Sequence, residues 1–89
     1  MKAVIDISGQ PIGNVLIKTS LQHRKGVVRT QTINNGFRIK FDSVGNARKA
    51  LKALYNELKE IDPETSYLEF NKNTFRYDAS YCVLSKIYE

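Results

Sequence analysis

The chain has 89 residues, of which 42% are hydrophobic, so it can build one small core. Its 14 Lys and Arg residues outnumber 9 Asp and Glu residues, which gives a net charge of +5. The single cysteine, Cys82, excludes an intrachain disulfide, and no apolar run has the length of a signal peptide or membrane span. These features predict one domain over residues 1–89, cytoplasmic, with no membrane contact.

The first half of the chain has the composition of strands. Residues 2–8 are rich in β-branched side chains, residues 15–21 alternate in polarity, and a polar turn, HRKG, follows them. Residues 27–33 and 37–41 are two further apolar runs. The Asn35-Gly36 pair between them fits a two-residue hairpin turn. We therefore predict four strands, the last two forming a hairpin.

That hairpin turn decides which side chains share a face of the sheet. It places Ile33 opposite Arg38 and Gln31 opposite Lys40, whereas a three-residue loop would place Arg29 beside the core. The predicted core face is apolar and carries Phe37, Ile39, Phe41, Val28, Thr30 and Thr32. The opposite face carries Arg29, Gln31, Arg38 and Lys40.

Residues 44–61 are predicted to form one long amphipathic helix. Apolar residues recur there at spacings of three and four: Val44, Ala47, Leu51, Leu54, Leu58 and Ile61. Asp42 or Ser43 supplies the N-cap, and Asp62-Pro63 ends the helix.

The C-terminal third is predicted to begin with a hairpin of residues 67–70 and 74–79. The tail, residues 80–89, fits either a strand or a short helix capped by Asp78, and the helix is slightly favoured. The predicted fold is α+β, an antiparallel sheet of about four to six strands with one long helix packed on one face. Its order is ββββ-α-ββ, followed by the ambiguous C-terminal segment.

Charge is unevenly distributed along the chain. Residues 18–52 hold nine bases and one acid, a net of +8, whereas residues 53–89 hold four bases and seven acids, a net of −3. Arg48 and Lys49 also lie at the start of the predicted helix, whose dipole favours acids there. An anion bound at residues 43–46, with Gly45 allowing close approach, would explain those bases. The alternative is a solvated basic surface.

These charges predict a nucleic-acid-binding protein that contacts phosphates, with duplex favoured because the sheet face shows no exposed aromatic between its bases. The candidate residues form two surfaces on opposite sides of the sheet. The first holds Arg24, Lys25, Arg48, Lys49 and Lys52, and the second holds Arg29, Arg38 and Lys40.

Two stretches resemble nucleic-acid-binding families. The segment NARKALKALYNEL resembles the helix of double-stranded-RNA-binding domains whose first residues contact phosphates, although the lysine pattern differs. The segment GFRIKFDSVGNARKAL resembles the strand-to-helix junction of integrase arm-binding domains, which read DNA with the sheet face. Each resemblance covers about half the chain and implies nucleic-acid binding by analogy.

Enzyme chemistry is not predicted. His23 is the only histidine, no carboxylates have metal-ligand spacing, and no phosphate-binding loop is present, so neither metal nor cofactor is expected. A metal-independent ribonuclease using His23, Arg24, Lys25 and a tyrosine is the least unlikely enzyme.

The alternative function is a protein-interaction module. A regulator, an inhibitor or a homodimer would fit, of the kind that phage or plasmid accessory genes encode. The tyrosines of the C-terminal third favour it because tyrosine is enriched at interfaces: Tyr67, Tyr77, Tyr81 and Tyr88.

Overall fold

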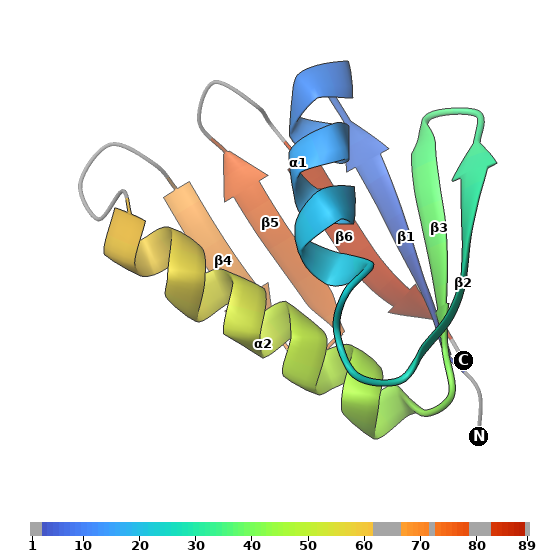
Figure 1. Ribbon diagram of the computed structural model, residues 1–89. Helices are drawn as coiled ribbons and strands as arrows, with labels where there is room; N and C mark the ends of the chain where they lie inside the picture. The colour runs from blue at the N-terminus through green and yellow to red at the C-terminus, as the bar shows by residue number, and fades with distance from the viewer. Residues whose placement is uncertain (1–2, 62–66, 72, 79–82, 89) are drawn as a thin grey trace.

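The computed structural model describes residues 3–61, 67–71, 73–78 and 83–88. Eight elements follow one another: β1 (Ala3–Gly9), α1 (Pro11–Leu21), β2 (Val27–Ile33), β3 (Gly36–Phe41), α2 (Val44–Ile61), β4 (Tyr67–Asn71), β5 (Thr74–Asp78) and β6 (Val83–Tyr88). The strands form one antiparallel sheet in the order β2-β3-β1-β6-β5-β4. Both helices lie on the same face of this sheet (Figure 1). The predicted α+β class and antiparallel sheet are confirmed, but the described residues form two helices where one long helix was predicted.

Strand β1 lies in the middle of the sheet, and its sequence alternates as expected for a strand that is covered on one face. Ala3, Ile5 and Ile7 are buried beneath the helices, and the residues between them point to the other face. Strand β1 pairs with β3 on one side and with β6 on the other. The core therefore lies between the sheet and the two helices.

The predicted strand at residues 15–21 is wrong, because these residues belong to α1. Pro11 occupies the start of the helix, where its missing N–H costs nothing. Asn14, Ile17 and Leu21 are buried at helical spacings of three and four. The strand-like alternation arose because α1 also exposes apolar side chains to solvent, so polarity did not mark its two faces.

The β2–β3 hairpin forms with a register two residues away from the predicted one. Ile33 pairs with Gly36, and Asn34 and Asn35 connect the strands. Gly36 belongs to β3 and not to the turn. The position requires glycine, because a side chain there would overlap the backbone carbonyl oxygen of Ile7 on β1. A shift of two residues keeps the side chains that follow the regular pairing on their predicted faces.

Val28 departs from that face assignment. The β2–β3 register shifts between Val27 and Arg29, so Val28 occupies a bulge and is 60% exposed. Val27 packs against the core in its place.

The long helix is confirmed over Val44–Ile61, with Ser43 as its N-cap. The backbone N–H of Asn46 donates to Ser43 Oγ at 3.1 Å, and the Asn46 side chain donates to Asp42 Oδ1 at 2.8 Å. The buried side chains of α2 follow the expected stripe: Ala47, Ala50, Leu51 and Leu54. Asp62-Pro63, predicted to end the helix, lies outside the described residues.

The C-terminal hairpin is confirmed as β4 and β5, but the favoured helical interpretation of the tail is wrong. Residues 83–88 form β6, which fills the position between β1 and β5. Ile87 faces the core and is 4% exposed, whereas Tyr88 lies on the other face. Cys82 is outside the described residues.

One buried polar side chain connects α1 to the sheet. Asn14 is 5% exposed, and its Nδ2 donates to the carbonyl oxygens of Gly9 at 3.1 Å and Asn35 at 3.0 Å. These bonds satisfy two backbone acceptors where β1 enters α1 and where β2 turns into β3. Asn14 therefore fixes the start of α1 against the hairpin.

Candidate functional site

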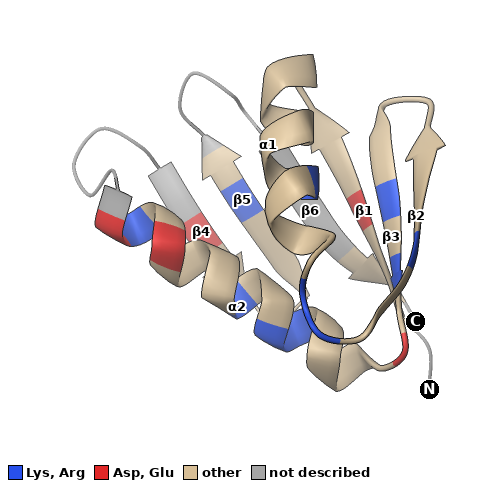
Figure 2. Cartoon of the chain, viewed as in Figure 1, with Lys and Arg blue, Asp and Glu red and all other residues tan. Residues whose placement is uncertain are grey.

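The eight predicted binding residues lie on two sides of the molecule, as the sequence indicated. Arg29, Arg38 and Lys40 belong to β2 and β3, on the sheet face opposite the helices. The other five lie on α2 or on the connection between α1 and β2 (Figure 2). A ligand therefore meets one set or the other.

The groups expected to form an anion site at the start of α2 do not converge. Ser43 already accepts the N–H of Asn46, and the Asp42 carboxylate lies one residue before the cap. Arg48 extends toward the β4–β5 turn, where its Nε donates to Asn73 Oδ1 at 3.1 Å. The helix N-terminus is therefore capped by its own chain.

Three of the remaining helix-side bases gather where the α1–β2 connection meets α2, whereas Lys52 is exposed on α2 outside this group. Arg24, Lys25 and Lys49 line a hollow of about 170 Å³ with Asn46 and Ala50. Arg24 is engaged, because its Nη2 lies 2.6 Å from Glu57 Oε1 on α2. Glu57, which is unfavourable for the helix dipole, is thus the partner of a cation from another element.

No metal-binding cluster forms within the described part of the chain. Its His, Cys, Asp and Glu residues include no group of three that could hold a metal ion. His23 Nε2 lies 3.4 Å from the Gln22 side chain, and no carboxylate orients its ring in the described structure.

The sheet face that neither helix covers is called the open face below. Its centre is set by an ion pair between neighbouring strands, in which Arg38 Nε and Nη2 donate to Asp6 Oδ1 at 2.7 Å and Asp6 Oδ2 at 3.0 Å. This hydrogen bond, and then the charge of Asp6, raises the pKa of Arg38. Arg38 therefore stays cationic. Asp6 is the one acid on this face among the described residues of β1, β2 and β3, and its carboxylate is already paired with Arg38.

Two cations of the open face have no such partner. Arg29 and Lys40 are directly opposite each other on β2 and β3, and neither makes an ion pair in the described structure. Like charges at directly opposed positions destabilise a sheet. The pair therefore concentrates positive charge at a cost to folding.

The same cross-strand row continues to an aromatic side chain that the sequence interpretation placed elsewhere. Val4 pairs with Lys40 on one side and with Tyr88 on the other, and Tyr88 is 47% exposed. The row thus runs Arg29, Lys40, Val4, Tyr88 across β2, β3, β1 and β6. Residues 83–88 form a strand, so Ile87 and Tyr88 point to opposite faces of the sheet. The helical interpretation of the tail did not predict this alternation.

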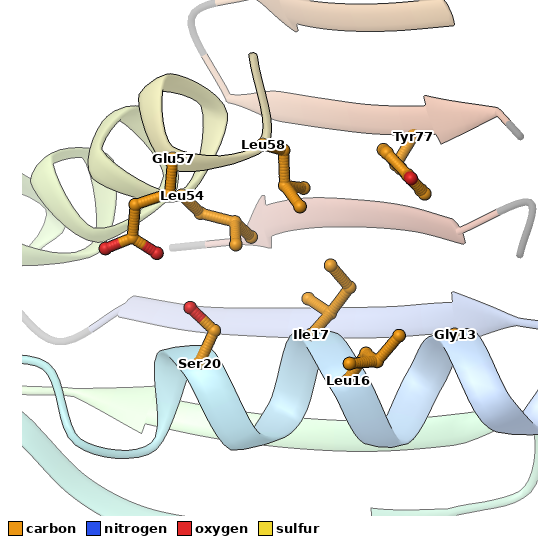
Figure 3. A pocket seen from close by; sticks show the side chains of 8 residues that line it. All are labelled: Gly13, Leu16, Ile17, Ser20, Leu54, Glu57, Leu58 and Tyr77. Carbon is orange, nitrogen blue, oxygen red and sulfur yellow. The ribbon is translucent and has the colours of Figure 1, made fainter. Parts of the chain in front are cut away.

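A second surface, formed by α1, has a different character and was missed. Ile12, Val15 and Leu16 are 67%, 53% and 50% exposed, and are called the α1 apolar surface below. Beside them a groove of about 320 Å³ separates α1 from α2, with Leu16 and Ile17 facing Leu54 and Leu58 (Figure 3). Contiguous exposed apolar residues of this kind are typical of interaction surfaces.

Comparisons with protein-family models, with curated proteins and with solved structures found no match for this chain. Neither of the two helices in the described residues combines the length and apolarity needed to cross a membrane.

Proposed function

We propose that this protein binds nucleic acid through the basic half of its open face. The observation that carries the proposal is the Arg29–Lys40 pair, two cations held opposite each other that make no ion pair with any described acid. Phosphates provide the missing counter-charge, and folding would be relieved of the repulsion when they bind.

The shape of the face suits an extended polyanion. Strands β2 and β3 place Arg29, Lys40 and Arg38 on the face of the sheet that neither helix covers. On the far half of the face, Glu69 and Arg76 are opposite each other on β4 and β5, so these two charges offset each other. Among the described side chains of the face, unpaired positive charge is therefore found on β2 and β3, which gives a bound polymer a defined place.

The test is fluorescence anisotropy with the whole protein and labelled DNA and RNA, single-stranded and duplex, at about 50 mM and about 150 mM salt. We expect binding that weakens steeply between the two salt concentrations, because phosphate contacts release counterions. Absence of binding to all four polymers at the lower salt concentration would contradict the proposed function.

The α1 apolar surface favours a second candidate function, self-association through α1. Ile12, Val15 and Leu16 form an uncharged patch on a protein with a net charge of +5. Lys18, the one charged residue of α1, has its Nζ 4.5 Å from the centre of the Phe37 ring. Two copies could therefore place their α1 helices together without opposing like charges there.

Replacing Ile12 by Glu and Val15 by Lys adds no net charge and tests this candidate. Both side chains are more than half exposed, so the free energy of unfolding should change by less than about 0.5 kcal/mol. If α1 is a dimer interface, sedimentation should show a dimer for the unchanged protein and a monomer for the double variant. A monomer for both proteins at every concentration would eliminate self-association.

A further inference from the structure

We infer that the open face selects single-stranded nucleic acid, with Tyr88 stacking on a base; this inference rests on the proposed function. The sequence alone favoured a duplex, because it gave the sheet face no exposed aromatic. Strand β6 places one there, since Val4 pairs with both Lys40 and Tyr88.

The row of side chains has the order that a single strand requires. Arg29 and Lys40 lie at one end, Val4 is a half-buried apolar residue between, and Tyr88 lies 47% exposed at the other end. Four neighbouring strands span about 14 Å, the length of a few nucleotides. The sugar-phosphate backbone can follow the cations while one base turns toward the tyrosine ring.

A duplex cannot use the whole row. The faces of its bases are stacked inside, so a tyrosine on an uncovered sheet can reach the backbone or the base edges but cannot stack on a base. Base–aromatic stacking is available only to an unpaired base. Tyr88 therefore contributes to single-strand affinity and adds nothing to duplex affinity, which separates its role from that of Arg29 and Lys40.

Tyr88 also shares the open face with a cation whose position is fixed. Arg38 belongs to the next cross-strand row, opposite Asp6, and its two bonds to Asp6 hold it there. The face therefore presents both a stacking surface and positive charge to a single strand.

The experiment measures binding of a labelled oligouridine of about 12 nucleotides, and of a duplex of the same length, to Tyr88→Leu and Tyr88→Phe. We expect Tyr88→Leu to lose at least about fivefold in single-strand affinity, with the salt slope and duplex affinity unchanged. Tyr88→Phe retains the ring and should bind within about twofold of the unchanged protein. Because Tyr88 is 47% exposed, both variants should fold, and thermal melting checks this.

The possible results separate the inference from the proposed function. If replacing Arg29 and Lys40 weakens binding while Tyr88→Leu does not, the single-strand inference is wrong and the phosphate interface stands. Tighter binding to the duplex than to the single strand would also overturn the inference. If the unchanged protein binds neither probe, the single-strand inference is overturned, and absence of binding to all four polymers overturns the proposed function as well.

Discussion

Replacing Arg29 and Lys40 together by glutamine should weaken nucleic-acid binding by about tenfold or more at low salt and, at the same time, stabilise the fold. The binding loss follows from removing two phosphate contacts, which should reduce the slope of log affinity against log salt by about 1.4 for a single strand. The stability gain follows from removing two directly opposed like charges, at about 0.2–1 kcal/mol.

The opposite signs of these two effects make the prediction specific. A pair that stabilises the fold would lose stability when neutralised, and a pair that does not contact nucleic acid would gain stability without weakening binding. Anisotropy at several salt concentrations measures the first effect, and chemical denaturation measures the second.

A matched control is available on the other side of the molecule. Lys49 and Lys52 are exposed on α2 and make no ion pair in the described structure, so Lys49→Gln with Lys52→Gln removes the same net charge. This control should lower affinity much less, through the overall charge alone. Equal losses from the two double variants would show that the open face is not the interface.

Gly36→Ala should destabilise the fold by about 3 kcal/mol or more. A methyl group at this position would overlap the carbonyl oxygen of Ile7, which is backbone and cannot rotate away. Strands β1 and β3 would have to separate at the end of their pairing, where Gly36 is opposite Ser8, so relieving the overlap costs strand pairing.

Gly45→Ala is the natural comparison for this substitution. The added methyl meets only Ser43 Oγ, at an ordinary contact distance of 3.9 Å, and alanine is a better helix former than glycine. Denaturation should show Gly45→Ala as stable as the unchanged protein or up to about 1 kcal/mol more stable. Similar stability of the two alanine variants would contradict the close packing at Gly36.

The accuracy of the sequence-based fold depended on whether polarity marked the two faces of an element. In α2 and in β3 buried and exposed side chains differ sharply, and both elements were predicted with the correct faces. In α1, Ile12, Val15 and Leu16 are apolar and exposed, so the helical period was hidden. The prediction of α1 thus failed because its exposed surface is apolar. Departures from the usual burial pattern are expected where a surface has a function.

The candidate site divides in the same way. Alternation along β2 and β3 was sufficient to place Arg29, Arg38 and Lys40 together, because neighbouring positions on a hairpin follow from local pairing. The partners of Arg24 and Arg48 could not be predicted, since Glu57 and Asn73 come from elements distant in sequence. Tyr88 joins the site only through the β1–β6 pairing, a contact between the two ends of the chain.

The central claim is that nucleic acid binds the open face, and residue-resolved NMR during titration with the single-stranded oligouridine tests it most directly. The claim predicts that backbone amide signals of β1, β2, β3 and β6 shift, with Arg29, Lys40 and Tyr88 among the largest changes, while the outer faces of α1 and α2 stay unchanged. Shifts confined to α1, α2 and the connection at Lys25, or no shifts at a saturating concentration of the oligonucleotide, would contradict it.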